Sequence, residues 1–379
     1  MARLDAFLQL GREQGCSDIH LAVGIPPTLR LHGELIPVKY RELAEDELRD
    51  LIEEVMTEPQ RAAFASGQDL DFSYAGAEAG RFRVNVFRKL GGMGASFRVI
   101  PSHSPSLESL GLPPVVKNLT RHHQGLLLVT GATGTGKSTT LAAMIDHINS
   151  TRRLNIITLE DPIEFVHQSK MCLVVQREVG THVGSFAEGL QAALREDPDI
   201  ILVGELRDVE TISLAMTAAE TGHLVLGTLH TTSATKTLDR ILDAMPGEQR
   251  TQGAMFLAQS LRGVVSQALL RTADGRGRKA IAEVLVMTTA ISNLIVSGKV
   301  FQVPSMLQTG KDLGMQLMDQ ALLEALQRKE IDPDDAYRCA ADKRPFQRFV
   351  TDPSLLPKVN LVGGPSGFRT GGGGMPPRP

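Results

Sequence analysis

The chain lacks tryptophan and has few aromatic side chains of any kind. Among its 379 residues, Phe, Trp and Tyr together make up 4%, and the formal net charge is −3. Proteins that bind single-stranded nucleic acids combine aromatic side chains, on which bases stack, with basic grooves that follow the phosphates. A slightly negative net charge also gives no general attraction to acidic membrane surfaces. The composition therefore argues against a nucleic-acid-binding protein.

Cysteine is also scarce. Cys16, Cys172 and Cys339 are the only cysteines, they lie far apart, and no CxxC pair occurs. This number and spacing argue against both a disulfide framework and a zinc module of the CxxC type. We expect three free thiols in a reducing compartment.

Long apolar runs are missing as well. The first residues, "MARLDAFLQLGREQG", carry charges throughout and have no unbroken apolar centre, so they do not resemble a secretory signal peptide. No stretch approaches the roughly 20 apolar residues that a membrane-spanning helix needs. We therefore expect a soluble, cytoplasmic protein that reaches a membrane only through partners.

The sequence pattern changes near residue 100, which indicates two domains. Residues 1–100 combine helical segments with short alternating strands and end in an antiparallel meander, predicting a small α+β domain. Residues 101–113 are rich in Pro and Ser and predict a linker. Over 114–355, continuous apolar strands alternate with helices, predicting an α/β domain with a mostly parallel sheet covered on both faces. The Gly/Pro-rich residues 356–379 are predicted to be disordered.

The segment "LLLVTGATGTGKSTTLAAMIDHI" combines an apolar strand, a glycine-rich turn and a helix. Gly131, four further residues and Gly136-Lys137-Ser138 match the phosphate-loop pattern in its expected context. Backbone N–H groups of such a loop surround phosphate oxygens at a helix N-terminus. We expect Lys137 to bridge the β- and γ-phosphates of ATP and the Ser138 hydroxyl to bind Mg²⁺. The predicted nucleotide-binding residues of the loop are Gly131, Ala132, Thr133, Gly134, Thr135, Gly136, Lys137, Ser138 and Thr139.

Carboxylates follow two of the predicted parallel strands. Glu205 follows "DIILVG", and Glu160 ends "NIITLE", with Asp161 and Glu164 close behind. Ligands of such sheets bind at the carboxyl ends of the strands. We predict that Glu205 activates the attacking water, that Glu164 assists on the water or the metal, and that Glu160 and Glu164 join Ser138 at the metal. Helix capping stays open as another role for the acids near position 160.

Histidines flank another apolar strand, "HLVLGTL". His230 follows its carboxyl end, at the sheet edge expected for Glu205, so it could sense the γ-phosphate. A purely structural role is equally compatible with this position. His223, before the strand, and His122 and His123, before the sheet, are weaker candidates.

Arginines recur along "GRFRVNVFRK" and "SFRVIP" of the first domain. Strand alternation places Arg81 and Arg83 on one face, from which they could reach the nucleotide phosphates, since guanidinium binds phosphate with two parallel hydrogen bonds. A solvated sheet face is an equally good interpretation. The sequence does not tell which arginines act across a subunit boundary. The remaining candidates are Arg88, Arg98, Arg195, Arg207 and Arg240.

The motifs, taken in order, resemble a known family. The sequences "GATGTGKSTT", "ITLEDPIEFVHQ", "LREDPDIILVGELRD" and "TGHLVLGTLHTTSA" are similar to the phosphate loop, aspartate box, second carboxylate strand and histidine box of secretion-superfamily ATPases. Outside this core, "SDIHL", "GRFRVNVF" and "LGMQLMDQAL" resemble the PilT/PilU type IV pilus retraction ATPases. The resemblance covers roughly residues 1–340.

This resemblance implies a homohexameric ATPase in which ATP and Mg²⁺ bind between a PAS-like N-terminal domain and a RecA-like domain. It implies mechanical work on an inner-membrane platform protein, driving pilus retraction and twitching motility. The protein would then be cytoplasmic and peripherally associated with the inner membrane through the pilus machine. A paralogous retraction ATPase is a further candidate partner, and no nucleic acid is expected.

Two departures from the PilT pattern keep alternatives open. The segment Ala290–Ser297 reads "AISNLIVS" where the PilT group has "AIRNLIRE", and "GATGTGKS" is nearer to PilU than to the "GPTGSGKS" usual in PilT. The related extension ATPases are longer and usually carry a tetracysteine zinc module, which this chain lacks. The main hypothesis is a retraction motor. Its alternatives are an accessory PilU-like ATPase or regulator and a DNA-dependent RecA-like ATPase.

Overall fold

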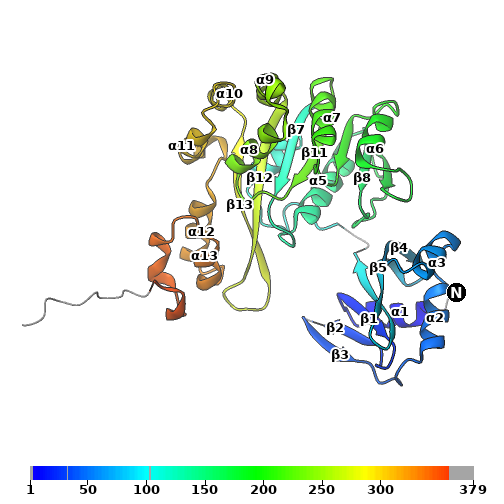
Figure 1. The fold of residues 1–379 in the computed structure, drawn as a ribbon. Coiled ribbons are helices and arrows are strands. Elements are labelled where there is room, and N and C mark those ends of the chain that lie inside the picture. Colours follow the sequence, from blue (N-terminus) through cyan, green and yellow to red (C-terminus); the bar gives the residue numbers. More distant parts are fainter. Residues whose placement is uncertain (1–2, 32, 102–103, 358–379) are drawn as a thin grey trace, which may run out of the picture.

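The computed structural model describes residues 3–31, 33–101 and 104–357, and Figure 1 shows two sheet-containing bodies within them. The predicted disordered tail lies almost entirely outside the described residues. The N-terminal body ends with a strand at Ile100, and the next helix begins at Val115.

The N-terminal body is an antiparallel sheet with the order β3-β2-β1-β6-β5-β4, so the expected small α+β domain is confirmed. Its elements are α1 (Asp5–Glu13), β1 (Asp18–Ala22), β2 (Thr28–Leu31), β3 (Glu34–Pro37), α2 (Glu45–Glu53), α3 (Glu58–Ala65), β4 (Leu70–Gly76), β5 (Gly80–Lys89) and β6 (Gly92–Ile100).

Alternation along β5 builds the core of this domain. Phe82 and Val84 are fully buried and pack with Phe97 of β6 and Leu8 of α1, whereas Arg83 points to the other face. One sheet face is therefore apolar and covered by helices, and the other carries charged side chains.

The segment after residue 44 forms two separate helices, α2 and α3. Thr57 is the N-cap of α3 and forms a capping box with Gln60, whose side chain accepts from the Thr57 N–H at 2.8 Å. Pro59 follows at the second helical position, where its missing N–H costs nothing. The Thr-x-x-Gln signal was present in the sequence and marks the start of a new helix.

The core body is a seven-stranded sheet with the order β13-β12-β7-β11-β10-β8-β9, parallel except for β13, which confirms the predicted mostly parallel α/β domain. Its elements are α4 (Val115–Leu119), β7 (Gly125–Thr130), α5 (Lys137–Thr151), β8 (Asn155–Glu160), β9 (Leu173–Glu178), α6 (Phe186–Ala193), β10 (Ile200–Val203), α7 (Val209–Glu220), β11 (Leu224–Leu229), α8 (Ala234–Ala244), α9 (Arg250–Ser260), β12 (Leu261–Arg271) and β13 (Arg278–Val286).

Every residue of β7, β10 and β11 is buried, because helices cover both faces of the sheet. α5 packs on one face and α7, α8 and α9 on the other. In register, Val203 of β10 lies opposite Leu159 of β8 and Gly227 of β11, and Thr130 of β7 lies opposite Leu229. The carboxyl ends of these strands therefore form one edge of the sheet.

Short helices follow the last strand. They are α10 (Thr289–Val296), α11 (Val303–Thr309), α12 (Met318–Gln327) and α13 (Pro333–Cys339), with 3-10 turns at Val300–Gln302, Lys311–Leu313, Arg344–Phe349 and Pro353–Leu355. A further 3-10 turn, Gly247–Gln249, lies earlier in the chain, between α8 and α9. α12 and α13 lie beside the β12–β13 hairpin (Figure 1), where Leu322 and Phe346 are fully buried. No helix within the described residues is long and apolar enough to cross a bilayer.

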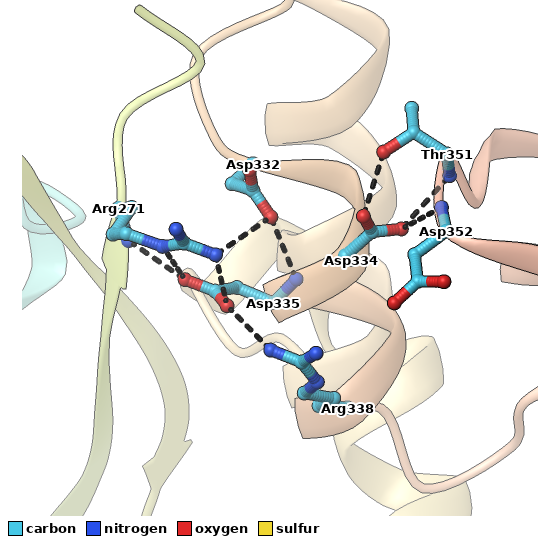
Figure 2. A network of polar contacts seen from close by, with 7 residues as sticks. All are labelled: Arg271, Asp332, Asp334, Asp335, Arg338, Thr351 and Asp352. Atoms are coloured by element: carbon cyan, nitrogen blue, oxygen red, sulfur yellow. Dashed lines mark hydrogen bonds and ion pairs between the residues drawn. The ribbon is translucent and has the colours of Figure 1, made fainter. Parts of the chain in front are cut away.

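A polar network fastens α13 to the hairpin (Figure 2). The Arg271 guanidinium donates to both carboxylate oxygens of Asp335 at 2.8 and 2.9 Å, and Asp332 caps α13 by accepting from the Asp335 N–H at 2.9 Å. Asp334 accepts from the Thr351 N–H and hydroxyl at 2.8 and 2.6 Å. The chain beyond α13 is thus held against that helix.

Candidate active site

The phosphate loop joins β7 to α5. Gly136 has a φ of 88° and is the N-cap of α5, which begins at Lys137. A Cβ on Gly131, whose φ is 148°, would lie 2.4 Å from the Gln267 carbonyl oxygen. Both positions therefore require glycine, and the N-terminus of α5 is left facing the loop, as anion binding requires.

Lys137 lies inside the loop and is only 8% exposed. Its ammonium donates to the carbonyl oxygens of Gly131 and Ala132 at 3.0 and 3.1 Å. Burial lowers its pKa, while the negative charges of Glu205 and Glu164 act in the opposite direction. The lysine charge thus lies among the carbonyls of the loop, and the two carboxylates favour its protonated form.

Gln267 of β12 supports the loop from the neighbouring strand. It is 5% exposed, and its amide nitrogen donates to the Thr135 carbonyl at 2.8 Å while its amide oxygen accepts from the Thr140 hydroxyl at 2.8 Å. The sequence analysis missed this residue. A single glutamine inside the apolar stretch "VVSQALL" was the available signal, since a buried amide needs partners.

Glu205 and His230 lie together at the carboxyl edge of the sheet. The His230 Nε2 is 3.2 Å from Glu205 Oε1, and the Arg207 Nε is 2.7 Å from Glu205 Oε2. Arg207 also lies 4.0 Å from Asp161. The sequence pattern correctly placed the glutamate and the histidine at one edge, and it left Arg207 as one candidate among several.

Glu160 and Glu164 have different surroundings. Thr158 and Gln176 donate to Glu160 Oε1 at 2.7 and 3.1 Å, and burial raises the pKa of this carboxyl despite these donors. Glu164 is exposed and lines the same cleft as the phosphate loop. Of the two predicted metal-site carboxylates, Glu164 is therefore the more accessible in this conformation.

A cleft of about 1080 Å³ separates these groups from the N-terminal domain. Core residues on its wall include Lys137, Ser138 and Thr139, and the N-terminal domain contributes Asp18, Asp71, Arg83 and Arg98. This volume lies at the upper end of the range that small-molecule ligands occupy. The nucleotide-sized space thus has phosphate-binding groups on one wall and arginines on the other.

The candidate arginines differ in what they contact. Arg83 pairs with Asp71 through contacts of 3.1 and 2.6 Å, and Arg98 pairs with Asp18 at 2.9 Å. Arg81 instead pairs with Glu178 of the core at 2.8 Å. Arg88 packs over the Phe64 ring and donates to its carbonyl, outside the cleft. Sequence alternation alone could not separate these roles.

The weaker sequence candidates lie elsewhere. Arg195 and Arg240 are exposed and are not among the cleft residues found in the described part of the chain. His223 immediately precedes β11, at the opposite edge of the sheet, and the side chain of His123 contacts Arg152 at 3.2 Å.

The donor set suits Mg²⁺. No cluster of three or more His, Cys, Asp or Glu side chains that could hold a metal occurs within the described residues. Mg²⁺ at nucleotide sites is held by one or two protein oxygens, the phosphates and water rather than by a protein cage. The Ser138 hydroxyl and the Glu164 carboxylate, both on the cleft wall, are oxygen donors of this kind.

The chain is similar to known proteins over most of its length. The family described as "Type II/IV secretion system protein" matches residues 66–331. The chain is 50% identical over 316 residues to the type IV pilus retraction ATPase PilT of Pseudomonas aeruginosa, covering 83% of this chain and 92% of PilT. It is 40% identical over 332 residues to the PilU ATPase of the same organism, covering 88% and 87%.

A solved structure extends the similarity to three dimensions. The crystal structure described as the pilus retraction motor PilT with bound ADP matches with a TM-score of 0.85 and 43% identity, covering 92% of this chain and 99% of that chain. Because the match covers 92% of this chain, it includes residues of both bodies of the fold. By sequence and by structure, the chain belongs to the type II/IV secretion system protein family, in its PilT/PilU group of pilus retraction ATPases.

Proposed function

We propose that this chain is an ATP-hydrolysing motor that drives type IV pilus retraction. The observation that carries the proposal is the position of Glu205 and His230, 3.2 Å apart at the sheet edge beside the phosphate loop, in a chain 50% identical to PilT. A protein that only binds nucleotide does not need a strand-end carboxylate in this place.

Nucleotide binding is assigned to the loop Gly131–Thr139 and to the far wall of the cleft. The loop amides and the N-terminus of α5 hold the β-phosphate, and Lys137 leaves its carbonyl partners to contact the β- and γ-phosphates. Arg83 lies across the cleft and exchanges Asp71 for phosphate when the nucleotide arrives. Arg81, the other arginine of the predicted pair, is bound to Glu178 instead and has a different role, argued below.

Hydrolysis is assigned to the carboxylates of the core. Glu205 orients and polarises the attacking water, His230 contacts the same carboxylate from β11, and Arg207 holds its second oxygen. Ser138 and Glu164 would hold Mg²⁺, which neutralises charge on the β- and γ-phosphates when bound. Glu160, with its raised pKa and its bonds to Thr158 and Gln176, is the weaker metal candidate.

The family membership also supports a proposal for assembly and partners. The chain forms a homohexamer, stays on the cytoplasmic side and works on the inner-membrane platform protein of the pilus machine. The absence of a helix able to span a bilayer within the described residues is compatible with attachment through that partner. Light scattering of the purified chain should give about six times its mass of 41.0 kDa. A stable ATP-hydrolysing monomer would contradict this assembly.

A primary motor is favoured over an accessory one. Identity to PilT is 50% and to PilU 40%, each over more than four fifths of the chain. The segment Ala290–Ser297 still departs from the PilT pattern. In α10, the frame residues Ile291 and Ile295 are buried, and the arginine-to-valine position, Val296, is 47% exposed. Ser292, the other replaced arginine position, is half-buried and its hydroxyl donates to the Ala258 carbonyl of α9 at 3.4 Å. The departure therefore changes the exposed surface at Val296 and a contact with α9 at Ser292, while the two isoleucines of the frame stay buried.

Complementation tests this function. A P. aeruginosa strain lacking its own PilT should regain pilus retraction and twitching when it carries this chain, and should not regain them with Lys137→Ala. Restoration only in a strain that retains an active PilT but lacks PilU would assign the accessory role. ATPase assays with and without single-stranded DNA complete the test, because stimulation by DNA would favour a RecA-like DNA motor instead.

A further inference from the structure

Glu178 is a buried carboxylate outside the phosphate cleft, at the end of the edge strand β9. It is 4% exposed, and no feature of the sequence pattern singled it out. A buried carboxylate is costly unless donors surround it, so the identity of its donors shows what it holds together.

Two of its donors come from the N-terminal domain. The Ser73 hydroxyl of β4 and the Arg81 guanidinium of β5 each donate to Glu178 Oε2 at 2.8 Å. The Arg81 Nε is buried and has no hydrogen-bond partner in the described part of the chain, so the guanidinium contacts the carboxylate through one nitrogen and not as a two-pronged fork. A single-pronged contact is easier to release than a bidentate one.

The other donors come from the core. The backbone N–H of Ile163 donates to the same oxygen, Oε2, at 3.1 Å, and the Thr181 hydroxyl donates to Oε1 at 3.2 Å. Ile163 immediately precedes Glu164, the accessible carboxylate on the cleft wall, and is itself 3% exposed. One carboxylate oxygen therefore joins the N-terminal domain to the loop that carries Glu164.

We propose that Glu178 is a positioning residue for Glu164 and that Arg81 makes this positioning depend on the seating of the N-terminal domain. With Arg81 and Ser73 in place, the Glu178 charge is compensated and its oxygen holds the Ile163 N–H. When the N-terminal domain moves away, the carboxylate loses its cation, turns toward other donors and releases the loop at 161–164. The motion of the N-terminal domain is thereby coupled to the position of Glu164, which follows Ile163 directly in the chain.

The proposal rests on the assignment of Glu164 to hydrolysis, and hydrogen–deuterium exchange separates the two claims. In nucleotide-free protein, Arg81→Ala and Glu178→Gln should both speed exchange in the peptide that contains the Ile163 amide. Arg81→Lys should leave it near the wild-type rate, because lysine keeps a charge and a single donor. If Arg81 acted only by binding phosphate, its loss would leave exchange unchanged without nucleotide, and that result would overturn the proposal.

Steady-state kinetics provide the second readout. Arg81→Ala and Glu178→Gln should each lower kcat about tenfold with KM changed less than about twofold, since a displaced catalytic group affects the chemical step. The double variant should be no slower than the worse single one. Multiplied losses in the double variant, or a raised KM at unchanged kcat, would contradict a shared positioning role.

A matched control lies one residue away. Arg177 of β9 pairs with Glu196 at 2.5 Å, within the core and without a contact to the N-terminal domain. Glu196→Gln removes an ion pair of the same strand and should change neither exchange at Ile163 nor kcat. If Glu178→Gln fails to fold, the Arg81 variants still test the proposal, because the Arg81 side chain is 25% exposed and is easier to replace. If wild type shows no ATPase activity, the proposed function fails while the exchange result still tests the coupling.

Discussion

The N-terminal sheet and the core sheet differ in burial and in how their charged groups are paired. The core strands β7, β10 and β11 are buried along their whole length, so their polar residues gather at the carboxyl edge. The antiparallel β5 is half exposed, and two of its arginines, Arg81 and Arg83, pair with acids. Chemistry is thus concentrated at one edge in the core, whereas the N-terminal sheet offers charges over a whole face.

This difference has a consequence for the cleft. On the N-terminal wall, Arg83 and Arg98 are neutralised by Asp71 and Asp18, and on the core wall Glu205 is paired with Arg207. Lys137 is held by backbone carbonyls instead. We therefore expect Lys137 to be essential for ATP binding and hydrolysis. Arg83 and Arg98 should change only the affinity for ATP.

Removing the core cation should have the largest effect. Lys137→Ala deletes the buried charge that faces the β- and γ-phosphates and should lower kcat by about 100-fold or more, as the loss of one electrostatic stabiliser commonly does. ATP binding should weaken while the circular dichroism spectrum stays unchanged. Lys311→Ala, at an exposed position paired with Glu324, is the control and should retain full activity. Full turnover in the Lys137 variant would end the phosphate-loop assignment.

The second-largest effect should come from replacing Gln267, which supports the phosphate loop. Gln267→Leu leaves the Thr135 carbonyl and the Thr140 hydroxyl without their buried partner, which should lower the free energy of unfolding by about 1–3 kcal/mol. The loosened loop should also bind ATP more weakly. Urea unfolding and titration with a fluorescent ATP analogue measure the two effects, and Gln259→Leu, on an exposed site of α9, serves as the control. Unchanged stability would mean that β12 does not hold the loop.

Replacing either member of the Arg83–Asp71 pair on the N-terminal wall should have a smaller effect on ATP affinity, in opposite directions for the two residues. Arg83→Ala should weaken ATP binding, whereas Asp71→Asn frees the guanidinium and should strengthen it. Neither change should alter stability by more than about 1 kcal/mol, because the Arg83–Asp71 pair is exposed. Isothermal titration at low and moderate salt tests both variants. If both substitutions changed the affinity for ATP in the same direction, Arg83 would not contact the nucleotide.

A last effect should appear only at acid pH. Burial lowers the pKa of His167, on the cleft wall, so folding favours its neutral form. Its contribution to stability is present above the unfolded-state pKa of about 6.5 and is lost as the pH falls below it, by at most about 1.4 kcal/mol per pH unit. Relative to His167→Asn, wild type should therefore lose stability between pH 7.5 and 5.5. If the difference in unfolding free energy between wild type and His167→Asn were the same at both pH values, this histidine would not contribute to the pH dependence of stability.

Much of the fold and the main site residues followed from local sequence patterns. Gly131, Lys137 and Ser138 have fixed spacing in a strand-turn-helix context, and Glu205 and His230 end apolar strands of a parallel sheet, so chain order alone placed them at one edge. Such patterns work because they depend on neighbours in the sequence.

The missed features depend on contacts between distant segments. Gln267 supports the loop only because β12 lies beside β7. Arg81 contacts Glu178, and not the cleft, because that carboxylate ends an edge strand 97 residues later in the chain. Long-range pairing of polar groups has no periodicity from which it could be inferred.

The central claim, that the core edge performs the chemistry, is tested most directly by Glu205→Gln. The substitution keeps the shape of the side chain and removes the charge that polarises the water. Single-turnover hydrolysis should slow by about 100-fold while the Kd for ATP changes less than about threefold, because the carboxylate acts on the chemical step and not on phosphate binding. Hydrolysis at the wild-type rate, or a loss explained entirely by weaker ATP binding, would contradict the account.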